Sequence, residues 1–177
     1  GSLLLVQEHY KNLNNAFMLS STLKGLVIHT ADEAGSADGP DYTFGWGLLN
    51  TAKCVATISN TNSNRIIEEN LLNLTSSEIS IYSDGAVPLW TTLCWNDPKA
   101  SVSSSSLDPT TVKLINDLDI RIIRVSDNQS FMPYVLNPAS PANAATTGDN
   151  IRDNVEKVYL SAPQAGFYKI KVTHKGT

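Results

Sequence analysis

The sequence predicts a protein that is α+β by content, with three short helices followed by an antiparallel β-sandwich or jelly roll. Apolar residues recur at helical spacing over residues 1–58, whereas later runs alternate between apolar and polar residues. A polar run at residues 59–64 separates these two patterns. We therefore expect a helical unit over residues 1–58, a linker over 59–64 and a β-sandwich over 65–177.

Three helices are predicted in the N-terminal unit. The first covers residues 3–12. The second begins at Ser20 or Ser21, either of which can cap it, and stops at Gly35, while the third begins at Leu48. About sixty residues rarely bury enough apolar surface alone, so these helices are expected to need a covering partner.

A glycine turn precedes the third helix. Gly45 and Gly47 flank Trp46, and glycine permits backbone angles and close contacts that a Cβ atom would forbid. We expect this turn to hold the indole in a fixed place.

The C-terminal unit contains seven predicted strands. They cover residues 65–74, 78–82, 87–95, 118–125, 131–136, 155–161 and 167–174. In the last run, Tyr168, Ile170 and Val172 alternate with polar residues, which predicts a half-buried antiparallel strand at an edge of a sheet. Many short strands with turn-rich connections are typical of a sandwich or jelly roll.

Composition excludes several classes of function. The 177 residues include 41% hydrophobic and 17% charged residues, and the formal net charge is −4. This balance is that of an ordinary globular protein. No basic cluster occurs, so neither nucleic acid nor an anionic membrane is an expected partner. The apolar run at residues 3–6 is too short to span a membrane and has no charged region before it, so no signal peptide is expected within this sequence.

Two cysteines, Cys54 and Cys94, do not form a disulfide framework. They are expected either as two free, mostly buried thiols or as one bridge, so they do not settle the cellular compartment.

Acidic residues carry the main chemical hypothesis. Calcium takes about six to eight oxygen ligands, and acidic loops and strand ends often supply them. The spacing here does not fit an EF-hand loop, and the same residues can instead form Asx-turns or pair with an arginine such as Arg121 or Arg124. Both interpretations stay open, and calcium is the only cofactor considered. The candidate calcium ligands are Asp117, Asp119, Asp149, Asp153 and Glu156.

Two tryptophans suggest an alternative function. Trp95 follows the inward alternation of Leu93 and is expected to be buried, whereas Trp90 lies on the opposite face. An exposed Trp90 would suit a carbohydrate-binding or adhesion module without enzymatic activity.

Residues 44–52 carry a resemblance to a known family. They read Phe44-Gly45-Trp46-Gly47-Leu48-Leu49-Asn50-Thr51-Ala52. This run resembles the Tyr-Gly-x-Gly-x-x-Asn-Ala pattern that opens the last helix of the catalytic domain in subtilisin-like serine proteases. Phe44 replaces the usual Tyr, and Thr51 is interposed before Ala52.

The C-terminal unit carries the same resemblance. Runs at residues 92–98, 114–120, 149–158 and 165–168 are similar, in order, to strand motifs of the P-domain-like jelly roll that follows some subtilase catalytic domains. The serine-rich insert at residues 101–106 departs from that pattern. The family usually adds one more strand after the position of Thr177, so the sandwich is expected to lack its last strand.

The resemblance implies a fragment of a secreted serine endopeptidase, a hydrolase of peptide bonds, located outside the cell or on its surface. The helices would be the remnant of an α/β catalytic domain, and the jelly roll would be a stabilising accessory module. The expected partners are the missing catalytic domain, peptide or protein substrates of the parent protein, and a second copy of this fragment through self-association. Subtilases of this type often bind calcium.

This chain itself supplies no recognisable catalytic set. Ser2 lacks the Gly-Thr-Ser setting of the family's nucleophile, and His9, His29 and His174 are isolated from the family's histidine motif. Nucleophilic serine catalysis requires a base within hydrogen-bond reach and an acid that orients it. We therefore expect the catalytic residues to lie outside this sequence.

Overall fold

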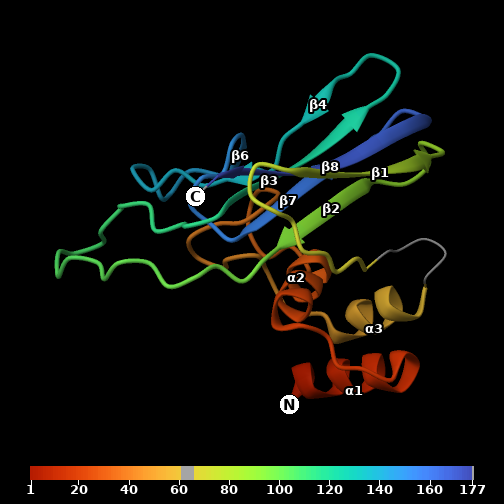
Figure 1. The fold of residues 1–177 in the computed structure, drawn as a ribbon, viewed down its shortest axis with the longest axis horizontal. Coiled ribbons are helices and arrows are strands. Elements are labelled where there is room, and N and C mark those ends of the chain that lie inside the picture. Colours follow the sequence, from red (N-terminus) through yellow and green to blue (C-terminus); the bar gives the residue numbers. More distant parts are fainter. Residues whose placement is uncertain (61–65, 177) are drawn as a thin grey trace.

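The computed structural model describes residues 1–60 and 66–176. Within these residues the fold is α+β, with three helices followed by antiparallel strands in a sandwich-like arrangement (Figure 1). This confirms the predicted fold class. The helices are α1 (Ser2–Asn14), α2 (Ser20–Thr30) and α3 (Thr51–Ser59).

Helix α1 ends at Asn14 rather than at residue 12, and Leu19, not Ser20 or Ser21, is the N-cap of α2. The end of α2 and the start of α3 also differ from the prediction, and one contact explains both. Asp32 and Leu48 form a short antiparallel bridge through their backbone groups. This extended pairing ends α2 at Thr30 rather than Gly35, and it holds Leu48 outside α3. Asn50 then caps α3, because its side-chain oxygen accepts a hydrogen bond from the Lys53 amide at 2.9 Å.

A small core holds the helices together. Its buried members come from all three helices and from the segment before α2. They are Val6, Met18, Leu26, Cys54 and Ile58. The opposite face of α1 stays open, because Leu4 is 74% exposed and Leu5 is 64% exposed.

Eight strands form three sheets within the described residues. The largest sheet has the order β1 (Ser76–Ser83), β8 (Gly166–Gly176), β3 (Asp117–Arg124) and β4 (Ser130–Phe131). A second sheet pairs β2 (Leu89–Cys94) with β7 (Val155–Leu160), and a third pairs β5 (Tyr134–Val135) with β6 (Thr146–Thr147). The sandwich core lies between the first two sheets and contains Ile120, Ile122, Val158, Leu160 and Tyr168.

Three strand predictions need correction. Residues 66–74 form no strand, and the predicted run 131–136 is divided between β4 and β5 at Pro133, which has no amide hydrogen for a ladder. The alternation of Tyr168, Ile170 and Val172 is confirmed, but β8 lies in the middle of its sheet rather than at an edge. Its polar residues face solvent on the outer side of the sheet, which produces the same pattern as an edge strand.

The helices lie beside the second sheet, where α2 contacts β2 (Figure 1). The polar run at 59–64 begins with Ser59, the last residue of α3, and Asn60, its C-cap; residues 61–64 of this predicted linker lie outside the described residues. The serine-rich insert is part of the loop between β2 and β3, which extends away from the sandwich in Figure 1. No helix in the described ranges is long and apolar enough to cross a membrane.

Candidate functional site

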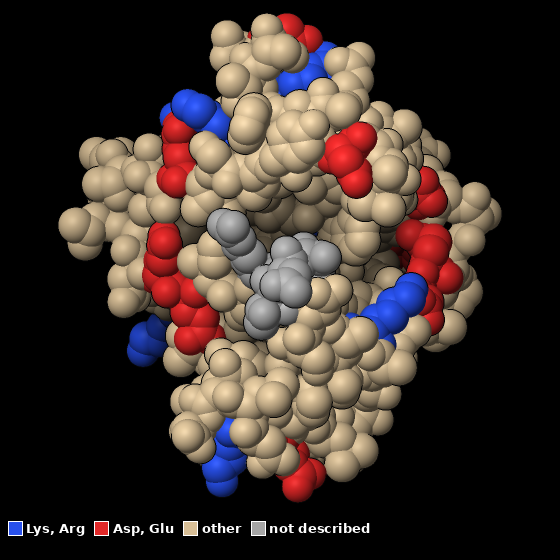
Figure 2. Space-filling model, turned by 90° about the vertical axis from the view of Figure 1, so that its right-hand side faces the viewer, with Lys and Arg blue, Asp and Glu red and all other residues tan. Residues whose placement is uncertain are grey.

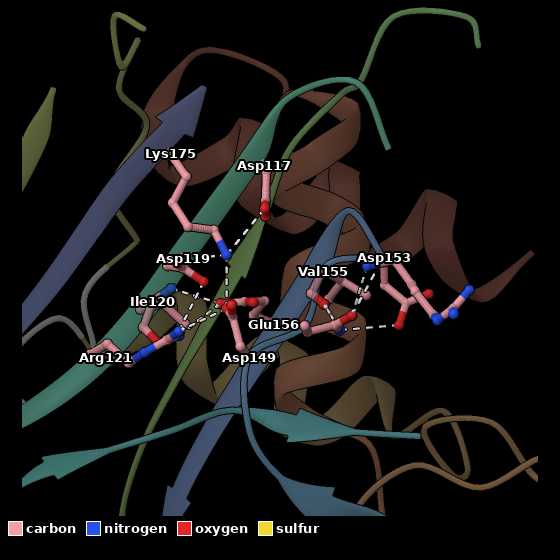
Figure 3. Close-up of polar contacts among 11 residues, drawn as sticks. Asp117, Asp119, Ile120, Arg121, Asp149, Asp153, Val155, Glu156 and Lys175 are labelled. Atoms are coloured by element: carbon pink, nitrogen blue, oxygen red, sulfur yellow. Dashed lines mark hydrogen bonds and ion pairs between the residues drawn. The ribbon is translucent and has the colours of Figure 1, made fainter. Parts of the chain in front are cut away.

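Four of the five acidic residues predicted as calcium ligands lie together around the first residues of β3. Figure 3 shows them around two basic side chains, Arg121 from β3 and Lys175 from β8. The four acids are Asp117, Asp119, Asp149 and Glu156. We call these six residues the charged cluster.

Lys175 bridges three of the carboxylates. Its Nζ atom lies 3.1 Å from Asp117 Oδ2, 3.2 Å from Asp119 Oδ2 and 2.8 Å from Asp149 Oδ1. Partial burial disfavours the charged ammonium, but hydrogen bonds to Asp149 and Asp117 outweigh it and raise the pKa of Lys175. The ammonium therefore occupies the position between the carboxylates where a bound cation would lie.

Arg121 contacts the fourth acid, Glu156, as well as Asp119 and Asp149. Its Nη2 atom lies 2.9 Å from Asp119 Oδ1 and 3.1 Å from Asp149 Oδ1, and its Nη1 atom lies 3.6 Å from Glu156 Oε2. The first two contacts are hydrogen bonds, whereas the third is too long for a hydrogen bond. Arg121 thus supplies the second positive charge of the cluster.

Glu156 is completely buried at the inner face of β7. Its Oε2 atom accepts a hydrogen bond from the Ile120 amide at 2.6 Å, while Oε1 has no partner among the described residues. Ile120 precedes the part of β3 that pairs with β4, so the carboxyl group takes the place of a neighbouring strand there. Burial raises the pKa of Glu156 to about 8, which makes this group largely protonated at neutral pH.

Asp119 and Asp149 differ in their ionisation. Burial raises the pKa of Asp119, and a hydrogen bond shared with Asp149 acts in the same direction. The hydrogen bond from Lys175 lowers the pKa of Asp149. Asp149 is therefore the more readily ionised member of this pair.

Asp153, the fifth predicted ligand, belongs to a different network. Its Oδ2 atom accepts a hydrogen bond from Asn150 Nδ2 at 3.1 Å, and Asn150 Oδ1 accepts from the amides of Arg152 and Asp153. This is an Asx-turn of the kind that was considered as the alternative to calcium binding. In Figure 3, Asp153 lies apart from the charged cluster.

The cluster as it stands is held by ion pairs and hydrogen bonds. In residues 1–60 and 66–176, no three His, Cys, Asp or Glu side chains are arranged so that they could hold a metal ion. Calcium binding by the predicted residues stays a prediction, and it would require the ammonium of Lys175 to move away.

The glycine turn joins the end of α2 to the start of α3. Gly47 has a φ of 100°, and a Cβ atom there would lie 2.1 Å from the carbonyl oxygen of Asp32, so this position accepts only glycine. Asn50 Nδ2 donates to Asp32 Oδ2 at 2.8 Å, and Lys53 pairs with the other oxygen. The hydrogen bond from Lys53, followed by that from Asn50, lowers the pKa of Asp32.

A second polar site joins α2 to the β2–β7 sheet. Lys157 Nζ lies in the partly buried space beneath α2 and donates to the carbonyl oxygens of Ile28 at 3.1 Å and His29 at 3.4 Å. Burial lowers the pKa of Lys157. Burial, together with the nearby ammonium of Lys157, also lowers the pKa of His29 to about 4, so the imidazole is neutral and shares a hydrogen bond with Thr92 Oγ1 at 3.1 Å.

Sequence reasoning did not find the pair formed by Lys157 and the end of α2. Lys157 and His29 are 128 positions apart, and each alone reads as an ordinary polar residue at the end of a helix or on the outer face of a strand. Only the packing of α2 on the sheet brings them together.

The tryptophans agree with their predicted faces. Trp95 is buried, and its Nε1 atom donates to the carbonyl oxygen of Asn116 at 3.2 Å. Trp90 is 37% exposed and lies between His29 and Tyr159, whose ring centroids are 5.5 and 6.2 Å from that of Trp90.

The cysteines and the serine–histidine contacts offer little reactive chemistry. Cys54 and Cys94 are both free, and burial raises the pKa of Cys94. Ser59 Oγ lies 2.8 Å from His9 Nε2 at an exposed site, but none of the described carboxylates forms a hydrogen bond with His9. This contact lacks the third group that orients the base in a triad.

Comparisons with known proteins give only weak likenesses, all of them to solved structures. No family model and no curated protein matches the chain. Among solved structures, a serine protease of Aeromonas sobria is similar to 98% of this chain with 13% sequence identity and a TM-score of 0.29. The chain spans 35% of that protease. A likeness of this strength supports no argument about the fold or the activity of the chain.

Proposed function

We propose that this chain is the C-terminal part of a secreted subtilisin-like serine endopeptidase. In this proposal the Ser-His-Asp triad lies upstream, the three helices complete the catalytic domain, and the β-sandwich is an accessory module that stabilises it. The proposal also divides the chain into a helical unit over residues 1–58 and a sandwich over 65–177.

The observation that carries the proposal is the role of the motif residues at 44–52. Gly47 admits the Asp32 carbonyl, and Asn50 both caps α3 and bonds to the Asp32 side chain. The residue types that define the resemblance are therefore the ones that this turn requires. Substitution of Gly47 or Asn50 would weaken the connection between α2 and α3.

Contacts between the helices and the sandwich support a stabilising role for the module. Lys157 bonds to the last carbonyl groups of α2, and Lys24 Nζ donates to Asn154 Oδ1 at 2.7 Å. A module that donates hydrogen bonds to the carbonyl groups at the end of α2 would hold that helix, and with it the proposed catalytic domain, in place. The exposed leucines of α1 supply an apolar surface that an upstream domain would cover.

A fluorophosphonate probe, which labels activated serines, tests the proposal. The full reading frame that includes residues upstream of Gly1 is expected to be labelled, and this chain alone is not. Labelling of this chain would contradict the assignment of the triad to an upstream segment. Absence of labelling from the full product would contradict the proposed endopeptidase activity.

The carbohydrate-binding alternative depends on Trp90, which leaves part of its ring open beside Tyr159. It predicts saturable binding to a member of a broad glycan panel and loss of that binding in Trp90→Phe, which keeps an apolar ring but reduces the stacking surface. Tyr82→Phe, on the outer face of β1, is the matched control. If no glycan in the panel binds, this alternative is wrong.

A further inference from the structure

An open cleft lies between the two main sheets on the side of β1 and β2. Its volume is about 630 Å³, which falls within the range of roughly 300–1,000 Å³ that is typical of binding pockets. Figure 2, which views the right-hand side of Figure 1, shows the molecule hollowed there, with mostly uncharged side chains around the opening.

The residues that line the cleft show how the two sheets face it. Every residue of β2 from Leu89 to Cys94 lines it, whereas β1 contributes only the alternate residues Ser77, Ile79 and Ile81. A strand that contributes consecutive residues presents its edge, and one that contributes every second residue presents its face. The cleft therefore runs along the edge of β2, over the inner face of the β1–β8 sheet.

This edge of β2 has no strand beside it within the described ranges, because β2 pairs only with β7. The Trp95 amide donates to the Asn154 carbonyl, next to the end of β7, at 3.3 Å. Because such bonds alternate along an antiparallel strand, the backbone groups of Trp90, Thr92 and Cys94 point to the open edge.

Nothing in the sequence of β2 protects this edge. Natural sheets guard their edges with charged side chains, prolines, bulges or a covering segment. The six residues Leu89–Cys94 contain neither a charge nor a proline, and their register with β7 has no irregularity. Residues 66–71 also line the cleft but form no strand beside β2, so this edge is still open to pairing with another stretch of backbone.

We propose that the cleft binds an extended peptide segment as an additional strand beside β2. The peptide widens the β2–β7 sheet and pairs with the free backbone groups of Trp90, Thr92 and Cys94. About six residues match the length of β2, since a strand rises about 3.3 Å per residue. A compact apolar molecule would fill the floor of the cleft but would leave these backbone groups unpaired.

The walls of the cleft specify the side chains of the peptide. Alternate side chains of the bound peptide point to opposite walls. One of these two sets faces Ile79, Ile81 and Val172 and is expected to be apolar. The other set faces α2, where Thr22 and Gly25 line the cleft together with Glu68, whose carboxylate accepts hydrogen bonds from the Leu19 amide and the Thr22 hydroxyl, and there small or polar residues fit. Neither the cleft nor the edge depends on the proposed endopeptidase, because both lie wholly within this chain.

The test uses the full 177-residue chain and an array of fluorescent hexapeptides. Each hexapeptide carries Val, Ile, Leu or Phe at three alternate positions, Ala, Ser or Thr between them, and two lysines after the sixth residue for solubility. We expect saturable binding by fluorescence anisotropy for members of the array. Hydrogen exchange of the amides of Trp90, Thr92 and Cys94 should slow at least tenfold when the peptide binds.

Two matched comparisons distinguish strand pairing from simple apolar contact. The same peptides with N-methyl groups on the edge that pairs with β2 should bind at least tenfold more weakly. Ile79→Asn, on the floor of the cleft, should weaken binding, whereas Ser80→Asn, on the opposite face of β1, should not. If Ile79→Asn does not fold, the N-methylated peptides still decide the result.

Several outcomes would overturn the proposal. One is the absence of saturable binding across the array, and another is equal binding of the N-methylated peptides, which would indicate an apolar ligand. Protection of the β2 amides that rises with protein concentration and without peptide would identify a second copy of this chain as the occupant.

Discussion

At the scale of single residues, the raised pKa of Glu156 makes the stability of the fold depend on pH. Between the ordinary value of 4.5 and its raised pKa of about 8, the folded state keeps a proton that the unfolded chain releases. Stability therefore falls as the pH rises through this window, because the unfolded state binds fewer protons. The raised pKa of Asp119 acts in the same direction.

Glu156→Gln tests this dependence. The amide oxygen can still accept the hydrogen bond from the Ile120 amide, but the side chain no longer titrates. We expect the fall in unfolding free energy between pH 5 and pH 8 to shrink by about 2–4 kcal/mol, since one pKa unit corresponds to about 1.4 kcal/mol. Urea unfolding at both pH values measures this change in unfolding free energy. The control is Glu78→Gln, which removes a carboxylate that pairs with Lys169 at the surface. An unchanged pH dependence in Glu156→Gln would contradict the protonated, buried state.

Gly47 gives a prediction about the glycine turn. Gly47→Ala places a Cβ atom against the Asp32 carbonyl, at a φ that alanine rarely adopts. We expect a loss of about 2–4 kcal/mol, in the range of strained backbone with a steric clash. Gly45→Ala is the matched control, because φ is 62° there but no atom lies within 4 Å of the added Cβ, so a loss of only about 1 kcal/mol is expected. Equal losses of unfolding free energy in both variants would contradict a special steric requirement for glycine at position 47.

Calcium binding by the charged cluster is tested by removing its central cation. Lys175→Met removes the cation that contacts Asp117, Asp119 and Asp149, and leaves Arg121 as the positive partner of Asp119 and Asp149. We expect the variant to be less stable than the parent chain without calcium, and to gain several degrees in melting temperature at millimolar calcium. Magnesium, which prefers a more rigid geometry, should give a smaller gain. Equal responses of parent and variant to calcium would contradict a cation site here.

At the scale of elements, local patterns gave the type of most helices and strands but not their neighbours. The alternation around Tyr168 indicated a strand with one buried face, yet a central strand with one solvent-exposed face reads the same as an edge strand. Leu48 fitted the helical spacing, but its pairing with Asp32 kept it outside α3. Such pairings depend on residues far apart in the sequence, so periodicity could not reveal them.

The charged cluster shows the same limit. The acidic residues could be singled out by type, and Arg121 was considered as a partner. Lys175 was not, because it reaches Asp117 and Asp119 only through the pairing of β8 with β3. Asp153 was grouped with the others because of its position near Glu156, but the loop before β7 directs it to Asn150 instead.

The contact between α2 and the sandwich gives a prediction at this scale. Lys157→Met keeps most of the side-chain volume but leaves the carbonyl oxygens of Ile28 and His29 without their donor. We expect a loss of about 1–3 kcal/mol in unfolding free energy, the cost of leaving buried polar groups unpaired. Lys169→Met, which removes a surface pair with Glu78, should cost at most about 1 kcal/mol. Similar small losses in both variants would show that Lys157 does not secure α2.

At the scale of the whole molecule, the described residues form two buried cores, and apolar surface stays open on α1 and in the cleft beside β2. The sandwich core around Ile122 and Tyr168 is fully buried, whereas the outer face of α1 and the cleft beside β2 are open. Soluble monomers rarely leave large contiguous apolar patches uncovered. We therefore expect a partner at each of these surfaces. The two partners should differ, because the helix face offers apolar side chains whereas the strand edge offers backbone hydrogen-bonding groups.

The face of α1 leads to the last prediction, that this chain self-associates when it is produced alone. Leu4 and Leu5 are 74% and 64% exposed on one helix, and contact with a second copy would remove their apolar surface from water. Light scattering at micromolar concentration should give a mass above that of the 19.2 kDa monomer. The double variant Leu4→Lys with Leu5→Glu should return the chain to a monomer, whereas Lys11→Gln and Glu8→Gln, on the same helix, should not. A monomeric parent chain would contradict the prediction. If the double variant still associates, the contact lies elsewhere than on α1, and the open edge of β2 is then the expected surface.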